Sequence, residues 1–148
     1  MKFVIQRTLK AQVFINNKLY SKIGKGILVL IGIDRNDQES TLDYYVRKIV
    51  NMRIFNDDQG LMNYSLLDIK GQILVVSQFT LLANTKKGNR PSYISAAKSK
   101  FAHHMYNQFI NKLKGYEINV EKGRFGAHMK LDFINDGPVT ILLGDNDE

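Results

Sequence analysis

ILVLIGI (Ile27–Ile33) and ILVV (Ile73–Val76) are the two stretches of sequence that decide the fold. Both are continuous apolar runs rich in β-branched residues. Runs of this kind are typical of strands that are buried on both faces of a sheet. Even the longer run is far too short to cross a bilayer as a helix. We therefore expect both runs to be central strands of a packed sheet.

Shorter patterns on either side of these runs predict the remaining strands. They lie at Phe3–Arg7, Gln12–Ile15, Glu117–Val120, Met129–Ile134 and Val139–Leu143. Asn16-Asn17 predicts a turn after the second of them. Asn135-Asp136-Gly137 predicts a tight turn between the last two.

Two segments have the periodicity of amphipathic helices. The first places apolar residues on one face, with Ser40 or Thr41 as the N-cap: Leu42, Tyr45, Val46, Ile49 and Val50. In the second segment, apolar residues recur every four positions, at Phe101, Met105, Phe109 and Leu113. Pro91 or Ser92 is expected to mark the start of this region, and Gly115 its end. Together these elements predict one α+β domain over residues 1–148, with a curved or barrel-like, mostly antiparallel sheet covered by two helices.

Composition limits the class of protein. The 148 residues are 44% apolar and 24% charged, which is typical of a soluble globular domain. No cysteine is present, which excludes disulfides, thiolate zinc sites and cysteine nucleophiles. The first residues, MKFVIQRTLK, lack the apolar stretch of a signal peptide. We therefore expect a cytoplasmic protein without a membrane segment.

Basic residues are concentrated in one part of the chain. The net charge is +7. Between Lys86 and Arg124 the sequence has nine basic residues and only two acidic ones, Glu117 and Glu121. Such a segment attracts polyanions, of which nucleic acid is the commonest. A solvated basic face that favours solubility is the equally plausible alternative. Charge alone does not decide between them.

Several common catalytic patterns are absent. The sequence contains no HExxH, GxSxG or P-loop motif. His103 and His104 are neighbours and would not face each other on a helix, so they make a poor metal pair. For these two and for His128 a structural or solvent-exposed role is expected. We predict neither a metal site nor a cofactor.

Ser77-Gln78-Phe79-Thr80-Leu81 places three hydrogen-bonding side chains at the carboxyl end of a buried strand. Polar groups at such a position need partners or a ligand, and strand ends are rigid platforms for sites. Thr80 offers a hydroxyl and Gln78 offers donors and an acceptor, and the backbone amides of Phe79 and Thr80 could stabilise an oxyanion. An ordinary polar junction between strand and loop is the alternative.

Asn135-Asp136-Gly137-Pro138-Val139-Thr140 contains a Gly-Pro bond. Only bonds that precede proline have an appreciable cis population, and a cis bond can turn two successive carbonyls to the same side. Two parallel carbonyl oxygens would accept hydrogen bonds from an ammonium group. The alternative is an ordinary trans turn.

At these two segments the chain resembles the D-aminoacyl-tRNA deacylase family, whose signature pair stands here as SQFTL (Ser77–Leu81) and GPVT (Gly137–Thr140). Further stretches are similar to the family along the whole chain: Met1–Arg7, Ile23–Gly32, Met52–Ser65, Gly88–Tyr93 and Gly123–Met129. One departure is His128, where many members carry Asp. The resemblance implies a homodimeric, β-rich α+β hydrolase that binds the acceptor end of aminoacyl-tRNA and releases the D-amino acid.

The resemblance also implies roles for particular residues. Gly137-Pro138 would be a Gly-cisPro motif inserted into the partner's active site, where its carbonyls capture the α-amino group while Arg7 fixes their orientation. Ser77, Gln78, Phe79 and Thr80 would line the pocket beside the ester. Phe125, Ala127 and Met129 would lie near the terminal adenosine. An L-residue would collide with the motif, whereas achiral glycine would be accepted, including glycine mischarged on tRNA-Ala.

Two nucleophiles are compatible with the sequence. Thr80 could attack the ester, although no base that would activate it is evident. Alternatively the 2′-hydroxyl of the terminal adenosine could activate water while the protein positions the ester; the missing acid–base residues favour this second route. A nucleic-acid-binding module without catalysis remains the rival from another functional class, and predicts salt-sensitive RNA binding without deacylation.

Overall fold

The computed structural model describes residues 1–144 of the chain. Its elements follow in the order β1 (Lys2–Ile15), β2 (Lys18–Ile23), β3 (Gly26–Gly32), η1 (Glu39–Thr41), α1 (Leu42–Val50), β4 (Phe55–Asn56), β5 (Met62–Tyr64), β6 (Gln72–Ser77), η2 (Phe79–Leu82), α2 (Ser99–Leu113), β7 (Asn119–Lys122) and β8 (Lys130–Gly144). Within this described part no helix is long and apolar enough to span a bilayer.

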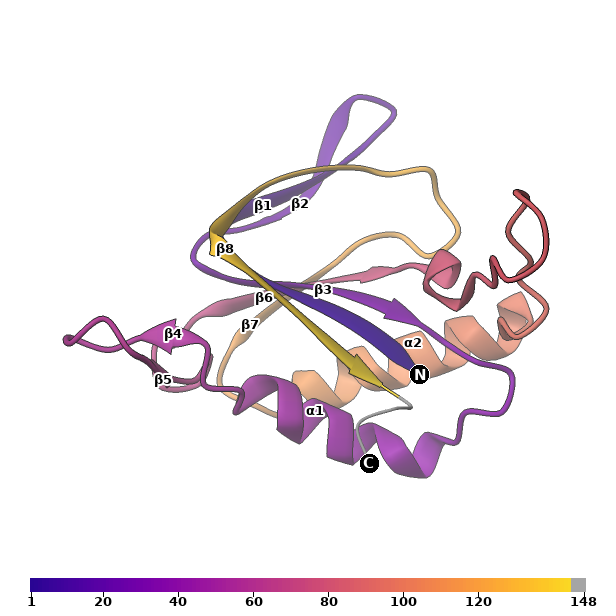
Figure 1. The fold of residues 1–148 in the computed structure, drawn as a ribbon. Coiled ribbons are helices and arrows are strands. Elements are labelled where there is room, and N and C mark those ends of the chain that lie inside the picture. Colours follow the sequence, from indigo (N-terminus) through magenta and orange to yellow (C-terminus); the bar gives the residue numbers. More distant parts are fainter. Residues whose placement is uncertain (145–148) are drawn as a thin grey trace.

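The main sheet is mixed and is organised around β1 (Figure 1). Its strand order is β2-β1-β3-β6-β7, and β8 pairs with the other edge of β1. β1 is antiparallel to β2, β3 and β8, whereas β6 is parallel to both β3 and β7. The short strands β4 and β5 form a separate antiparallel pair. Most pairings are thus antiparallel, as predicted, and the parallel group β3-β6-β7 lies at one end of the strand order.

The two apolar runs form β3 and β6, and both faces of each strand are buried, as predicted. Along β3 the side chains of Ile27, Val29 and Ile31 enter one core, whereas Leu28 enters a second core on the opposite face. β6 alternates in the same way, with Ile73 and Val75 in the first core and Leu74 and Val76 in the second. Because successive side chains of a strand point to opposite faces, a strand between two cores must be apolar throughout.

The first core lies between the sheet and the two helices, which run along the same side of it in Figure 1. α1 buries the predicted face, but Thr41 makes no capping hydrogen bond, since its hydroxyl donates to the carbonyl of Gln38. α2 begins at Ser99 rather than at Pro91 or Ser92, and Phe101 is exposed. The later start has a physical reason: the Ala97 amide donates to the Ile33 carbonyl just after β3, and Lys98 has extended backbone, so the helix cannot begin before Ser99.

The second core lies inside the curl of the sheet. It joins apolar residues of β1, β2, β3 and β6 with the segment that leads into β8. The hydroxyl of Ser21 in β2 donates to the carbonyl of Lys122 in β7 at 2.8 Å, which links strands from the two ends of the sheet. The sheet is therefore nearly closed, and the predicted α+β architecture with a barrel-like sheet is confirmed.

Two predicted breaks in strands are wrong. Phe3–Arg7 and Gln12–Ile15 belong to one strand, β1, because its middle stays paired with β8 through shifts of register. Met129–Ile134 and Val139–Leu143 likewise both belong to β8 apart from Met129, which precedes it. The predicted turn at Asn16-Asn17 is confirmed by positive φ angles of 52° and 61°. The strand predicted at Glu117–Val120 is displaced toward the C-terminus, at Asn119–Lys122.

The tight turn predicted at Asn135-Asp136-Gly137 is instead a bulge within β8. Gln6 pairs with Thr140 and Thr8 pairs with Asn135, so four residues of β8 lie opposite the single residue Arg7 of β1. A bulge bends a strand and turns the extra residues out of the ladder without ending the pairing. Both halves of β8 consequently remain on the same edge of β1, and Gly137-Pro138 stands out from it.

Candidate active site

The polar segment after β6 forms one wall of a pocket. The Gln78 amide still follows the sheet and donates to the Ile31 carbonyl at 2.8 Å, after which the chain turns into η2. Ser77 and Gln78 are half-buried, whereas Phe79 is 58% exposed and Thr80 is exposed. The prediction that polar groups gather at the carboxyl end of this buried strand is confirmed. Ser77 is the last residue of β6, so the central sheet positions the start of this segment.

The connection between β7 and β8 forms the opposite wall, and Tyr106 of α2 fixes it. The Tyr106 hydroxyl donates to the Val75 carbonyl at 2.9 Å and to the Gly123 carbonyl at 3.3 Å, and the Gly123 amide donates to Val75. Burial raises the pKa of the Tyr106 phenol well above its usual range, so the phenol remains a neutral donor. The position of the connection relative to β6 is therefore tightly determined.

The ring of Phe125 lies within an aromatic group at this wall. It stacks on the imidazole of His103 with ring centroids 4.6 Å apart and planes 9° from parallel, and it contacts Tyr106 at 5.7 Å. Phe125 is half-buried while His103 is exposed. An aromatic face supported in this way is suited to stacking against a nucleobase.

The pocket between the two walls has a volume of about 500 Å³. It brings together six residues that the sequence singled out in two separate segments: Ser77, Gln78, Phe79, Phe125, Ala127 and Met129. Thr80 does not line this pocket; the Gln78 side-chain amide donates to its hydroxyl. Among the residues that the structure describes, the lining contains no carboxylate, and most of it is apolar, as in small-molecule sites.

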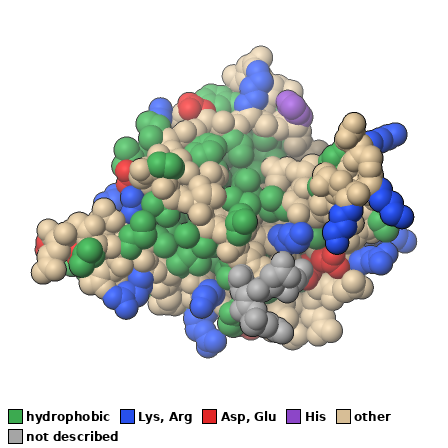
Figure 2. Space-filling model, viewed as in Figure 1, with side chains coloured by type: hydrophobic (Ala, Val, Ile, Leu, Met, Phe, Trp, Pro, Cys, Tyr) green, Lys and Arg blue, Asp and Glu red, His purple; other side chains and the backbone are tan. Residues whose placement is uncertain are grey.

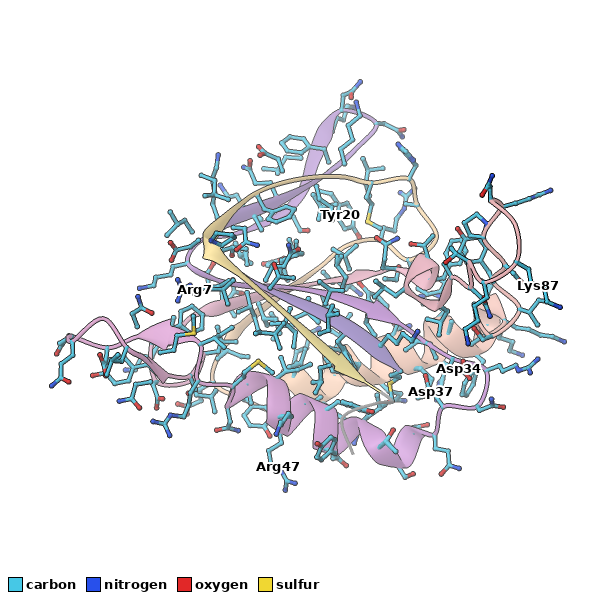
Figure 3. All side chains as sticks on the ribbon, in the orientation of Figure 1. Arg7, Tyr20, Asp34, Asp37, Arg47 and Lys87 are labelled. Atoms are coloured by element: carbon cyan, nitrogen blue, oxygen red, sulfur yellow. The ribbon has the colours of Figure 1, made fainter. Side chains whose placement is uncertain are left out.

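Gly137 and Pro138 lie outside the pocket. Both are exposed on the bulge of β8, and the bond between them is cis. Neither they nor Arg7 line the pocket of the same chain. Arg7 lies on the left of the molecule in Figure 3. The short helix η2, at which one wall of the pocket begins, lies on the right in the same orientation (Figure 1). One copy of the chain therefore does not bring the two predicted halves of the site together.

Arg7 anchors the bulge although it is an almost fully buried cation, with 6% of its surface exposed. Its Nε donates to the Asp136 carbonyl at 3.0 Å and lies 3.4 Å from the Asp136 carboxylate. Its Nη1 donates to the Ile54 carbonyl at 2.7 Å and to the side chain of Asn56 at 3.2 Å. From the other side, the Asn135 side chain accepts from the Val139 amide at 2.8 Å. These bonds hold the backbone on both sides of Gly137-Pro138.

Sequence reasoning missed two residues of the pocket. His128, for which a structural or solvent role was expected, lies on the lining while remaining exposed. Tyr106 also lines the pocket, and its position one residue after Met105 on an apolar helical face gave no functional signal. Only its contact with two separate backbone segments distinguishes it from an ordinary core aromatic.

The family model and the similar sequences point to one family. Residues 4–144 match the family model described as D-Tyr-tRNA(Tyr) deacylase. The chain is 54% identical over 144 residues to the D-aminoacyl-tRNA deacylase of Azobacteroides pseudotrichonymphae genomovar. CFP2, covering 97% of this chain and 96% of that protein. It is 53% identical to the D-aminoacyl-tRNA deacylase of Thermosipho melanesiensis, with the same coverage.

Two solved structures are similar to the whole chain. A structure described as c-Myc DNA Unwinding Element Binding Protein has a TM-score of 0.92 at 42% identity and covers 98% of this chain and 99% of its own. A probable eukaryotic D-amino acid tRNA deacylase has a TM-score of 0.83 at 20% identity, over 96% of this chain and 97% of that chain, and so shows the same fold.

Proposed function

Because the chain belongs to the D-aminoacyl-tRNA deacylase family and hydrolyses the ester of D-aminoacyl-tRNA, we propose that its pocket of about 500 Å³ holds that ester. The observation that carries this proposal is that two sequence-distant segments, Ser77–Phe79 and Phe125–Met129, wall the same cavity. The terminal adenosine stacks on Phe125 and is flanked by Ala127 and Met129. Its aminoacyl ester then reaches the end of β6.

The backbone at the start of η2 binds the carbonyl oxygen of the ester. Phe79 and Thr80 are the first residues of this short helix, and the opening amides of a helix have no acceptor within it. Donors placed in advance at this position stabilise the negative charge that develops as the carbonyl is attacked. Ser77 and Gln78 line the pocket beside them and orient the substrate.

Water is the nucleophile, and the 2′-hydroxyl of the terminal adenosine activates it. Water adds to the carbonyl carbon, the bond to the ribose oxygen breaks, and the proton lost by water ends on that oxygen. Support comes from Thr80, whose hydroxyl lies outside the pocket lining and has the amide of Gln78 as its neighbour rather than a base. Positioning and the amides then supply most of the catalysis.

A second copy of the chain completes the site. Gly137 and Pro138 are exposed and lie away from their own pocket, so we assign them to the pocket of a partner in a homodimer. Their carbonyls accept the α-amino group of the substrate, and Arg7 keeps the bulge in position. With the ester and the amino group both held, the side chain of a D-residue points outward. That of an L-residue collides with the bulge, which is steric exclusion.

The proposed function is tested with matched substrates. The purified protein should release D-tyrosine from D-Tyr-tRNA and leave L-Tyr-tRNA intact under the same conditions. Added EDTA should leave the rate unchanged, because the site described here uses backbone amides and RNA rather than a metal. Release of tyrosine from both enantiomers at similar rates would contradict steric exclusion by the bulge.

Glycyl-tRNA gives a second test of the exclusion mechanism. Glycine has no side chain to collide with the bulge, so we expect Gly-tRNA-Ala to be deacylated while L-Ala-tRNA-Ala is spared. A single-turnover assay on the two substrates, which differ by one methyl group, measures the effect directly. If neither substrate is deacylated, the pocket must require contacts with a D side chain, and rejection of an L side chain would not explain the specificity.

Binding of nucleic acid without catalysis is the second candidate. It is favoured by the structural relative whose description names binding to a DNA element. This alternative predicts salt-sensitive binding with no release of amino acid. The same D-tyrosine assay distinguishes the two functions.

A further inference from the structure

The chain leaves the body of the protein after Asn84 and returns at Ser92, and we call residues 85–91 the basic loop. Two reciprocal amide–carbonyl hydrogen bonds between Asn84 and Ser92, of 2.8 and 2.9 Å, close its base. All of its residues are exposed, and it carries three cations and no acidic residue: Lys86, Lys87 and Arg90. Lysine and arginine side chains gather on the right of Figure 2, and Figure 3 shows Lys87 pointing away from the body.

The base of the basic loop is attached to the wall of the pocket. The ring of Tyr93, two residues after the loop, packs edge-on against Phe79 with centroids 5.0 Å apart, and Phe79 lines the pocket. The Ser95 hydroxyl also donates to the Leu82 carbonyl of η2 at 3.2 Å. These contacts fix the loop beside the mouth of the pocket, so its charges act on whatever extends from that mouth.

Within residues 1–144 the cations of the basic loop have no acidic partner. Across residues 1–144 no ion pair joins Lys86, Lys87 or Arg90 to a carboxylate. Other cations of the same basic segment differ, since Lys112 pairs with Asp43 at 2.8 Å. Lys98 and Lys100, on either side of the lining residue Ser99, are exposed at the same wall and add to the positive charge there.

We propose that the basic loop binds the phosphates of the nucleotides that precede the terminal adenosine. This inference rests on the proposed function, because it requires the terminal adenosine to occupy the pocket. The single strand then leaves past Phe79, and its first phosphates lie beside the loop. Long flexible cations that contact phosphates supply affinity without reading sequence. The loop therefore contributes to binding of any tRNA and takes no part in cleavage.

The triple variant Lys86→Ala, Lys87→Ala, Arg90→Ala tests this inference. We compare D-Tyr-tRNA with D-tyrosyl-adenosine, which has the ester and the nucleoside but no phosphate. The KM for D-Tyr-tRNA relative to that for D-tyrosyl-adenosine should rise roughly tenfold at moderate salt. The slope of log KM against log salt should decrease by about 2, because each of the three lost phosphate contacts on a single strand contributes about 0.7 to it. The charge-conserving variant Lys86→Arg, Lys87→Arg, Arg90→Lys should retain both values.

A control triple removes the same charge elsewhere. Arg47, Lys48 and Lys70 are exposed and do not line the pocket, and Figure 3 shows Arg47 pointing away from the body of the protein. An equal rise in KM for Arg47→Ala, Lys48→Ala, Lys70→Ala would overturn the inference, because net charge alone would then explain the effect. An unchanged KM and salt slope in the loop triple would also overturn it, as would an equal loss on D-tyrosyl-adenosine. Failure of the wild-type protein to cleave either substrate would instead contradict the proposed function itself.

Discussion

D-Tyr-tRNA that ends in 2′-deoxyadenosine is expected to be cleaved on the order of a thousandfold more slowly than the same substrate with a complete ribose, within the range of general acid–base catalysis. The described pocket lining has no carboxylate, and Thr80 lies outside it. The 2′-hydroxyl is on the carbon next to the ester, so we expect it, rather than the exposed imidazole of His128, to activate water. Single-turnover rates on 3′-linked D-tyrosyl substrates measure the effect without a contribution from binding.

Thr80→Ala separates this route from an acyl-enzyme. The Thr80 hydroxyl accepts a hydrogen bond from Gln78, and its loss leaves both backbone amides of η2 in place. We expect Thr80→Ala to retain the wild-type rate within about fivefold, since a single neutral hydrogen bond contributes only about 1 kcal/mol. Thr85→Ala is the matched control, because it removes the same hydroxyl at an exposed position in the basic loop and should leave the rate unchanged. Complete loss of activity in a folded Thr80→Ala protein would favour Thr80 as the nucleophile.

Arg7→Ala is expected to lower kcat/KM for D-Tyr-tRNA on the order of a hundredfold, because a displacement of about 1 Å in a positioning group has effects of this size. Without Arg7 the carbonyls of Ile54 and Asp136 lose their donor, and the bulge that carries Gly137-Pro138 loses its anchor. The free energy of unfolding should also fall, by about 2–4 kcal/mol. Arg7→Lys retains the charge but not the planar fork, so it should restore activity only in part.

Two measurements show whether Arg7 positions the bulge or only stabilises the fold. Lys10→Ala, an exposed cation on the same strand, should leave both stability and activity unchanged. Discrimination against L-Tyr-tRNA should weaken in Arg7→Ala, a result that a general loss of stability would not produce. A folded Arg7→Ala protein with wild-type kinetics would remove Arg7 from the site.

Subunit complementation tests the shared site that the Arg7 prediction assumes. Arg7→Ala impairs the bulge and leaves the pocket intact, whereas Phe125→Ala impairs the pocket and leaves the bulge intact. If each site combines the bulge of one copy with the pocket of the other, the mixed dimer has one wild-type site. Random mixing should then restore about a quarter of the wild-type rate, since about half of the dimers are mixed. No recovery on mixing would contradict an active site shared between copies.

Much of the fold follows from local patterns in the sequence. The uninterrupted apolar runs identified β3 and β6 as doubly buried strands, and the spacing of Leu42, Val46 and Ile49 identified α1. These predictions hold because the periods of helix and strand depend on neighbouring residues alone. The polar residues after β6 were likewise visible as a cluster where a buried strand ends.

Other features depended on pairing between distant segments. Asn135-Asp136-Gly137 has the composition of a hairpin turn, yet it forms a bulge because both halves of β8 pair with the same long strand. The start of α2 was misplaced because the amide of Ala97 bonds to Ile33, more than sixty residues earlier. Local composition carries no information about such partners.

For this protein, the sequence by itself determined the family, the central strands and the residue types available for chemistry. The tertiary structure decided which of those residues meet: Phe79 and Phe125 face one cavity, whereas Gly137-Pro138 stands apart, held by Arg7. It also distinguished the cations of the basic loop, which pair with no carboxylate in the described part of the chain, from Lys112, which is paired with Asp43. The physical reason is that hydrophobic patterns act between neighbours in the chain, whereas sites arise from contacts that only the closed sheet makes.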